Sequence, residues 1–294
     1  MLPVYSCEDI ATLPADSRIR LGVIGNPIAH SKSPQMQQAA LDAAGINHTY
    51  VRLQAGLEEG GFEDLLQLLG KREFIGANVT VPFKKKAFAA AVQADSLSTL
   101  CGAANTLVRH PEGWHCYNTD GPGFEQAIAE LTPRPLSELR IVILGACGGA
   151  GSALCCQSIL SGCRHLTAVN RPRPELQQLR DKLLPHAAGE LHCITFDSPQ
   201  LQEAIKTADL IVNATSLGLH EGDALPLNAE WLHPGQIVYD IVTHPTPLQR
   251  VAASRGCTVS DGLGMLLWQG AIAYRHWFGK LPDISLMRNA LLRS

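Results

Sequence analysis

The fold is decided by one central stretch, Ile141-Val142-Ile143-Leu144-Gly145-Ala146-Cys147-Gly148-Gly149-Ala150-Gly151. Its apolar half predicts a buried strand, and the helical run 152–160 follows the glycine-rich turn. A second predicted strand, 166–169, completes a βαβ unit. In such units the backbone N–H groups of the turn and the N-terminus of the helix hold a pyrophosphate. We therefore predict a Rossmann-like nucleotide-binding domain.

The turn departs from the usual G-x-G-x-x-G/A pattern at one position. Aligned to that pattern it gives Gly145, Cys147 and Ala150, so a cysteine replaces the second glycine. A side chain there crowds the approach of the backbone to the phosphates, while Gly148 and Gly149 supply flexibility beside it. We expect this departure to affect cofactor affinity.

The residues that follow the second strand indicate which dinucleotide binds. NAD-binding folds usually place Asp or Glu there for the ribose hydroxyls, but this chain has Asn170-Arg171-Pro172-Arg173. Two guanidiniums without a carboxylate favour a 2′-phosphate. A solvated basic turn is the alternative interpretation. We predict NADP in preference to NAD.

In the first half of the chain, the stretch Asn78–Lys84 holds the strongest catalytic candidate. Val79 and Val81 alternate with polar residues, which predicts a half-buried strand that Pro82 ends. Lys84 follows at the strand exit and opens a helical segment expected to run to about residue 96. A lysine in a run of three is by itself most often a solvated surface charge.

Two serines precede the first strong helix signal. Ser33 is expected to cap a helix over 35–44, with Pro34 at its first position. A helix N-terminus favours an anion, so the Ser31 and Ser33 hydroxyls are candidates to hold a substrate carboxylate. The alternative is that Ser33 is only a cap.

Length and composition describe a globular protein of two domains. The chain has 294 residues, 46% hydrophobic content and a net charge of −3, which argues against a general nucleic-acid or acidic-membrane binder. No apolar run approaches the roughly 20 residues of a membrane span, and no signal peptide is visible. Residues 1–20 are expected to form an irregular leader, and a domain boundary is expected near 121–135.

The cysteines and histidines point to no metal and no disulfides. There are nine cysteines with no Cys-x-x-Cys pair, and eleven histidines with no His-x-x-x-His pair. We therefore expect reduced thiols, a cytoplasmic location and no bound metal.

Later segments place further candidates at strand ends and on a helix. Strands are predicted over 210–212 and 237–242, followed by the loops that begin at Asn213 and Thr243. Ligands bind at such carboxyl ends in open α/β sheets. An amphipathic helix over 261–277 carries Gln269, whose role depends on whether that helix returns to the first domain.

Together these stretches resemble the shikimate dehydrogenase family from about residue 22 to 277. The matching pieces, specific in their order, are Gly25-Asn26-Pro27-Ile28-Ala29-His30-Ser31-Lys32-Ser33-Pro34, Asn78–Lys84, Gly102–Thr106, Asn118-Thr119-Asp120-Gly121, Asn213-Ala214-Thr215-Ser216 and Asp261-Gly262-Leu263-Gly264-Met265. The resemblance implies an α/β fold of two α/β domains with a cleft between them. A substrate domain over 1–122, completed by 263–294, would precede a Rossmann-like NADP-binding domain over 123–262.

The resemblance also implies residue roles. The residues that would contact shikimate are Ser31, Ser33, Asn78, Thr80, Lys84, Asn105, Asp120, Thr243 and Gln269. The residues that would bind NADP are Gly145, Ala146, Cys147, Gly148, Gly149, Ala150, Asn170, Arg171, Arg173, Thr215, Ser216, Ile241 and Gly262. Thr243 stands where the family often has tyrosine, which leaves substrate preference open.

The implied reaction is the NADP-dependent, reversible reduction of 3-dehydroshikimate to shikimate in aromatic amino-acid biosynthesis. Lys84 and Asp120 are the acid/base candidates, since an adjacent carboxylate favours a protonated amine. A quinate/shikimate or relaxed-specificity dehydrogenase is one alternative, and a non-catalytic nucleotide-and-acid sensor is another. We expect a small-molecule substrate, no nucleic-acid or membrane partner, and a monomer or homodimer.

Overall fold

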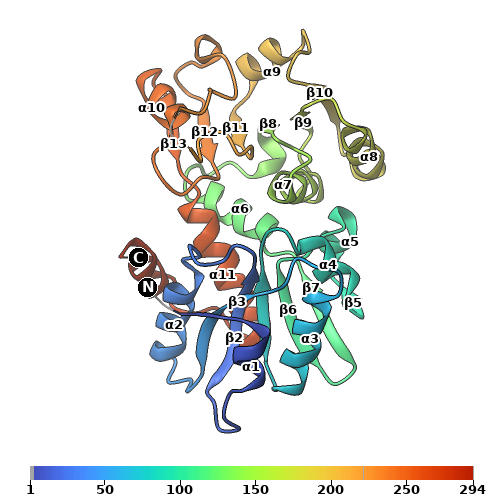
Figure 1. The fold of residues 1–294 in the computed structure, drawn as a ribbon. Coiled ribbons are helices and arrows are strands. Elements are labelled where there is room, and N and C mark those ends of the chain that lie inside the picture. Colours follow the sequence, from blue (N-terminus) through green and yellow to red (C-terminus); the bar gives the residue numbers. More distant parts are fainter. Residues whose placement is uncertain (1–2, 221, 294) are drawn as a thin grey trace. The chain divides into compact units, whose positions relative to one another are not determined.

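The computed structural model describes residues 3–220 and 222–293, and the chain forms two compact units. The first unit holds Met1–Thr119 and Leu266–Ser294, and the second holds Asp120–Met265. Each is an α/β structure built on its own sheet (Figure 1). No helix within the described residues is long and apolar enough to cross a membrane.

The sheet of the first unit has seven strands in the order β1-β3-β2-β4-β6-β7-β5. Its strands are β1 (Val4–Tyr5), β2 (Ile19–Gly25), β3 (Thr49–Gln54), β4 (Gly76–Val79), β5 (Gln93–Ala94), β6 (Thr106–His110) and β7 (Gly113–Tyr117). The β4–β6 and β6–β7 pairs are antiparallel, and the other pairs are parallel. The central strand β4 is buried along its whole length.

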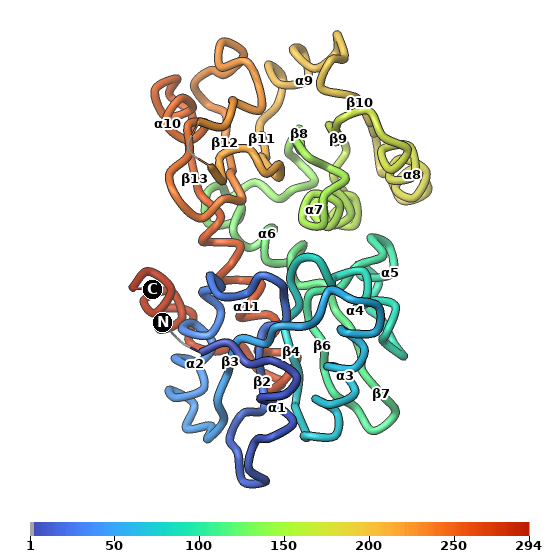
Figure 2. Tube along the Cα trace, viewed as in Figure 1, coloured from blue at the N-terminus to red at the C-terminus, as the bar shows by residue number. Residues whose placement is uncertain are grey.

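Helices cover both faces of this sheet (Figure 1). They are α1 (Cys7–Ala11), α2 (Ser33–Ala43), α3 (Gly61–Lys71), α4 (Lys84–Ala89), α5 (Ser96–Cys101), α11 (Leu263–Phe278) and α12 (Ile284–Leu292). Helices α1 and α3 bury Ile10, Phe62 and Leu69 on one face. On the other face the late helix α11 returns to the sheet (Figure 2). There the Trp277 indole N–H donates to the Leu107 carbonyl at 3.0 Å.

The second unit has six parallel strands in the order β10-β9-β8-β11-β12-β13. The strands are β8 (Arg140–Leu144), β9 (His165–Asn170), β10 (Glu190–Thr195), β11 (Leu210–Asn213), β12 (Ile237–Asp240) and β13 (Thr258–Ser260). The helices are α6 (Asp120–Ala129), α7 (Gly149–Leu160), α8 (Pro174–Leu183), α9 (Leu201–Thr207) and α10 (Pro247–Ser254), with 3₁₀ turns η1 (Leu136–Glu138), η2 (Leu184–His186) and η3 (Ala229–Trp231). This order confirms the predicted Rossmann-like arrangement.

Three local predictions were wrong. Residues 1–20 were expected to form an irregular leader, but among the described residues 3–20 β1 pairs with β3 and α1 packs into the core. The helix after Lys84 ends at Ala89, because residues 93–94 pair with β7 and the Asp95 carboxylate caps α5. Strand β4 stops at Val79, so Val81 lies outside it and is 68% exposed.

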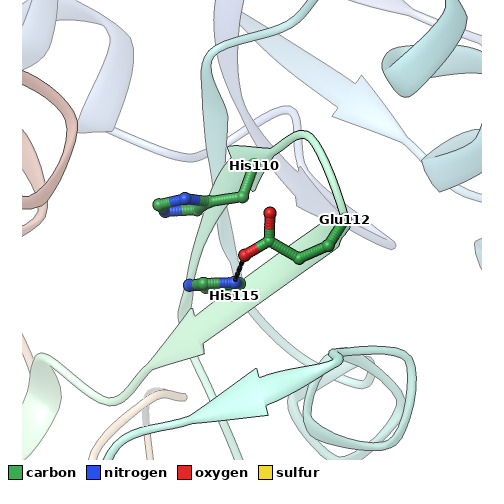
Figure 3. Close-up of side chains that lie close together, drawn as sticks. All are labelled: His110, Glu112 and His115. Atoms are coloured by element: carbon green, nitrogen blue, oxygen red, sulfur yellow. Dashed lines mark hydrogen bonds and ion pairs between the residues drawn. The ribbon is translucent and has the colours of Figure 1, made fainter.

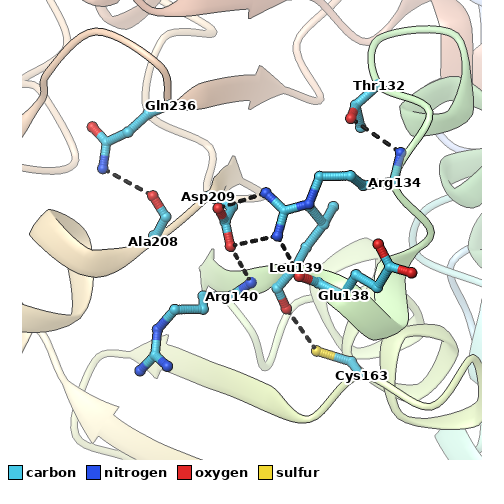
Figure 4. Close-up of polar contacts among 9 residues, drawn as sticks. All are labelled: Thr132, Arg134, Glu138, Leu139, Arg140, Cys163, Ala208, Asp209 and Gln236. Atoms are coloured by element: carbon cyan, nitrogen blue, oxygen red, sulfur yellow. Dashed lines mark hydrogen bonds and ion pairs between the residues drawn. The ribbon is translucent and has the colours of Figure 1, made fainter.

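Asp209 joins the second sheet to the segment that leads into it (Figure 4). Its carboxylate accepts hydrogen bonds from the Arg134 guanidinium and from the Arg140 backbone N–H, both at 2.8 Å. Arg134 also donates to the Glu138 carbonyl. Partial burial acts to raise the pKa of Asp209, but the Arg134 and Arg140 hydrogen bonds outweigh it and lower that pKa.

Asp209→Asn is expected to lower the free energy of unfolding by about 1 kcal/mol at pH 7, because the amide places an N–H group against these donors. Because the folded-state pKa lies below the unfolded-state value, the stabilisation is present above about pH 4 and is lost as pH falls through the folded-state pKa. Urea midpoints at pH 7, 5 and 3 measure this effect. Asp16→Asn, in an exposed turn, is the control, and a pH-independent difference would contradict the ionic origin.

Candidate functional site

The backbone fixes Lys84 at the exit of β4. Thr80 donates its N–H to the Ile24 carbonyl at 2.8 Å, and its own carbonyl accepts the Phe83 N–H at 3.0 Å. Lys84 is then the first residue of α4, and its carbonyl accepts the Ala104 N–H at 2.9 Å. Lys84 is half-buried, whereas Lys85 is exposed. The strand exit therefore holds Lys84 beside the segment that leads to Asn105.

Asn105 is the centre of a buried polar cluster in the first unit. Its side-chain oxygen accepts the backbone N–H of Thr119 at 2.7 Å and the Thr119 hydroxyl at 3.1 Å. Its side-chain amide donates to Gln269 Oε1 at 3.3 Å. Asn105 is 3% exposed and Gln269 is 8% exposed. The structure thus brings these two predicted site residues together from the segment just before β6 and from α11, and Asp120 follows Thr119 directly in the chain.

Asn78 supports this cluster from β4. Its oxygen accepts the Tyr50 hydroxyl at 2.7 Å, and its amide donates to the Thr106 hydroxyl at 3.1 Å and to the Asn105 carbonyl at 3.3 Å. Because Asn78 is buried and its carboxamide is engaged at both ends, it positions its neighbours. Burial raises the pKa of Tyr50 well above its usual value, so the phenol remains a hydrogen-bond donor.

The expected cap at Ser33 was wrong. Lys32 occupies the N-cap position of α2 without a side-chain hydrogen bond, and Ser33 is the first helical residue. Ser33 is buried, and its backbone N–H donates to Ser31 Oγ at 3.3 Å. The Arg52 guanidinium donates to the Ser31 carbonyl at 2.6 Å from Nη2. The two serines are therefore adjacent at the start of α2, with a buried cation behind their backbone.

Asp120 begins α6 and is 5% exposed. A carboxylate at this position benefits from the positive end of the helix dipole. Asp120 is the first residue of the second unit. Its neighbour Thr119 is the last residue of the Met1–Thr119 stretch of the first unit and is hydrogen-bonded to Asn105.

In the second unit the glycine turn makes close backbone contacts. Gly145 has a φ of +82°, and a Cβ there would lie 2.7 Å from the Ala214 carbonyl oxygen. A Cβ at Gly151 would lie 2.3 Å from the Gly145 carbonyl oxygen. Gly151 is therefore the glycine that lets α7 pack closely on the turn, a role that the alignment of the pattern on Ala150 missed.

A cavity of about 710 Å³ opens at this turn. The predicted residues that line it are Gly145, Cys147, Gly148, Asn170, Arg171, Arg173, Thr215 and Ser216. The predicted residues that do not line it are Ala146, Gly149, Ala150, Ile241 and Gly262. Its other wall, absent from the sequence prediction, is mainly apolar and comprises Phe196, Leu201, Ala214, Leu217, Leu225, Pro226, Leu227, Asn228 and Trp231. Apart from Leu201, which begins α9, these residues come from loops and turns that have no periodic pattern.

The charges around this cavity suit a phosphorylated ligand. Among the residues that the structure describes, its lining includes two guanidiniums, of Arg171 and Arg173, and no carboxylate. The Asn170 side-chain oxygen accepts the Cys147 N–H at 3.4 Å and so ties the end of β9 to the glycine turn. Burial, with a contribution from Glu175, raises the pKa of the Cys147 thiol, so the side chain stays neutral beside the phosphates' expected place. The cavity and its donors fit NADP.

A buried carboxylate organises the two loops beyond this turn, and sequence reasoning missed it. Asp240, fully buried at the end of β12, accepts from the Asn213 amide at 3.0 Å, the Thr246 hydroxyl at 2.7 Å and the Val242 N–H at 3.1 Å. Burial raises the pKa of Asp240, and these hydrogen bonds oppose that rise. The loop that contains Thr243, itself half-buried, is thereby fixed to β11.

Comparison with known proteins agrees with this geometry. Residues 23–107 match the shikimate dehydrogenase substrate binding domain model, and residues 262–292 match the shikimate 5′-dehydrogenase C-terminal domain model. A curated relative, shikimate dehydrogenase (NADP⁺) of Rubrobacter xylanophilus, is 38% identical over 275 residues, which is 92% of this chain and 94% of the relative.

Two solved structures are similar over nearly the whole chain. Shikimate 5-dehydrogenase of Thermus thermophilus, solved with NADP(H) and shikimate, is 33% identical with a TM-score of 0.81 and covers 94% of this chain and 99% of its own. Quinate dehydrogenase of Corynebacterium glutamicum, solved with NAD, is 27% identical with a TM-score of 0.84 and covers 95% and 100%. The chain belongs to the shikimate dehydrogenase family.

Proposed function

We propose that this chain catalyses the NADP-dependent, reversible reduction of 3-dehydroshikimate to shikimate in the pathway to aromatic amino acids. The observation that carries the proposal is the cavity at the glycine turn, whose described lining contains two arginines and no carboxylate. Such a lining suits a 2′-phosphate, and the NADP-dependent relatives agree with it. The buried Asn105 cluster supplies the other half, a rigid set of polar groups for a hydroxylated ring.

Each unit then has its own task. The unit formed by Met1–Thr119 and Leu266–Ser294 binds shikimate, and the unit Asp120–Met265 binds NADP. Ser31 and Ser33 hold the substrate carboxylate at the N-terminus of α2. Thr80, Asn105 and Gln269 contact the substrate ring, and Thr243 contacts the substrate from the loop after β12. The nine free thiols agree with a cytoplasmic location, and we propose a monomer or homodimer.

Lys84 and Asp120 carry out the proton transfer. When bound, NADPH supplies the hydride that reduces the C3 carbonyl. The carbonyl oxygen gains negative charge as this happens, and the Lys84 ammonium donates a proton to it, so that a hydroxyl forms. In the reverse direction Lys84 accepts that proton. Asp120 orients the ammonium and accepts a hydrogen bond from a ring hydroxyl. A positioned acid/base group contributes typically about 10²–10⁴-fold to the rate.

A quinate/shikimate dehydrogenase is the second candidate, because Thr243 replaces the tyrosine that the family often has and a quinate dehydrogenase shares this fold. Threonine is shorter and leaves more room beside the ring.

Steady-state oxidation of shikimate and of quinate, each with NADP⁺ and with NAD⁺, separates the candidates. We expect kcat/KM to be highest for shikimate with NADP⁺, with quinate at least about 100-fold lower, because a site built for one set of ring hydroxyls rejects analogues strongly. Comparable values for quinate would favour the second candidate. No turnover of either acid would leave only a non-catalytic sensor and would overturn both.

A further inference from the structure

The turn between β6 and β7 gathers three side chains that no step of the proposed reaction uses. His110 ends β6, Gly113 opens β7, and Pro111 and Glu112 form the two-residue connection between them. In the ladder His110 lies opposite Gly113, and Val108 lies opposite His115. Residues two positions apart on paired strands share a face. His110 and His115 are therefore diagonal neighbours on one face, with Glu112 at the turn (Figure 3).

The three groups converge closely. The imidazoles of His110 and His115 stack with centroids 3.7 Å apart and 12° between their planes. Glu112 Oε1 lies 2.7 Å from His115 Nε2. One potential ligand atom from each of the three residues lies within 4.8 Å of the other two. We call His110, Glu112 and His115 the hairpin cluster; among residues 3–220 and 222–293 no other set of His, Cys, Asp or Glu side chains meets this criterion.

We propose that the hairpin cluster binds one divalent transition-metal ion of the Zn²⁺ class. Two imidazoles and one carboxylate form a borderline donor set that suits Zn²⁺, Co²⁺ or Ni²⁺, whereas Ca²⁺ and Mg²⁺ require oxygen ligands. Water completes the coordination, because the Glu112 side chain is 56% exposed. The expectation of no bound metal was based on the absence of a His-x-x-x-His pair. That spacing is typical of a helix, and two histidines on either side of a hairpin turn do not show it.

Binding needs the two stacked rings to turn out of their nearly parallel arrangement. Zinc bonds of about 2.0–2.1 Å place neighbouring ligand atoms of a tetrahedral site about 3.3 Å apart, so the stacked rings must tilt toward one ion. His115 is 8% exposed and anchors the site, while His110 is half-buried and Glu112 is exposed, which leaves both able to turn. The bound ion then links the last residue of β6 to β7 and stabilises the hairpin.

The chain offers a matched control in its second unit. His165, Glu190 and His192 also form a His–Glu–His set, with His165 Nδ1 at 3.2 Å and His192 Nε2 at 4.0 Å from Glu190 Oε2. These three groups are exposed at their side chains and do not converge as a triplet. The two sets share composition and differ in geometry and burial, so a comparison between them tests the arrangement of the ligands and not their composition.

Calorimetric titration of the chelator-treated full chain with Zn²⁺ alone tests the proposal. Variants His110→Gln and Glu112→Gln change only half-buried or exposed side chains, so they keep the fold, which circular dichroism verifies. We expect one Zn²⁺ per chain in the wild type, at least about tenfold weaker binding in each of these variants, and wild-type binding in His165→Gln/His192→Gln. Absence of Zn²⁺ binding in the wild type, or a loss below twofold in both variants, overturns the proposal.

Co²⁺ distinguishes the hairpin cluster from the nine cysteines. A nitrogen and oxygen site gives visible d–d bands without the intense near-ultraviolet thiolate band. We expect such a visible spectrum in the wild type and its loss in Glu112→Gln. A spectrum dominated by a thiolate band that both variants retain would assign the metal to cysteine and overturn the proposal. Neither readout depends on enzymatic turnover, so failure here leaves the proposed function unaffected.

Discussion

Lys84→Ala is expected to lower kcat for 3-dehydroshikimate reduction by about 10²–10⁴-fold, while KM changes much less. In the proposed reaction the Lys84 ammonium acts as charge develops on the carbonyl oxygen, so its loss would remove an interaction that is strongest in the transition state. The alanine keeps the helix, because alanine has the highest helix propensity and the Lys84 backbone contact to Ala104 remains. Stopped-flow or steady-state oxidation of NADPH at saturating substrate measures the change.

Lys85→Ala is the matched control, because Lys85 is the next residue of α4 and is exposed. Lys85 carries the same charge as Lys84, and its replacement is expected to leave kcat within about twofold of the wild type. Small primary amines should restore part of the rate to Lys84→Ala, and not to Lys85→Ala, if the missing group is a proton donor. A Lys84→Ala enzyme with near-normal kcat and a raised KM would make Lys84 only a binding residue.

Asp120→Asn tests the contribution of Asp120 separately from that of Lys84. The amide keeps the size of the side chain and removes the charge that orients the ammonium, so kcat should fall, with a rise in KM from the weaker hydrogen bond to a ring hydroxyl. If Lys84→Ala and Asp120→Asn both retained near-full turnover, the proton assignment would be wrong. If the two residues act together as proposed, the double variant should lose far less than the product of the single losses.

The parts of the fold that could be predicted are those with strong local patterns. The strand Arg140–Leu144 was placed correctly because a strand buried on both faces is a continuous apolar run. The glycine turn and the helix after it follow from backbone geometry that only glycine tolerates, as the positive φ at Gly145 shows. Two dipeptide strands, β1 and β5, carry no such pattern and exist only because β3 and β7 offer free edges.

The residues of the candidate site likewise divide into those that a sequence pattern predicts and those that only the fold reveals. Asn105 and Gln269 lie 164 positions apart, and only the return of α11 to the first sheet brings them within hydrogen-bond distance. Their roles could be anticipated through family resemblance and not from spacing. The sequence did not predict a role for Asp240, because a carboxylate at a strand end is common. Only its complete burial among three hydrogen-bond donors shows that it holds the two loops. Burial of that kind is a property of the folded chain.

Arg171→Ala/Arg173→Ala is expected to raise KM for NADPH by about 10²–10⁴-fold and to leave KM for NADH within about threefold. Each hydrogen bond to a charged group contributes roughly 1.5–3 kcal/mol, and each 1.4 kcal/mol is tenfold in affinity. The two cofactors differ only at the 2′-phosphate, so preference is a difference between two binding energies that these side chains set. Both arginines line the cavity at the glycine turn.

The control for charge alone is Arg180→Ala, in the same unit, because Arg180 lies on α8 outside the cavity lining. It removes one positive charge from the same unit, against two in the double variant, and should change neither KM by more than about twofold. Raised salt should weaken NADPH binding to the wild type and not to the double variant, since screening acts on the arginine–phosphate attraction. Equal losses for NADPH and NADH in the double variant would mean that the arginines only shape the loop after β9. In that case the preference for NADP would have to come from the Asn170 and Cys147 end of the cavity, where the chain offers no cation.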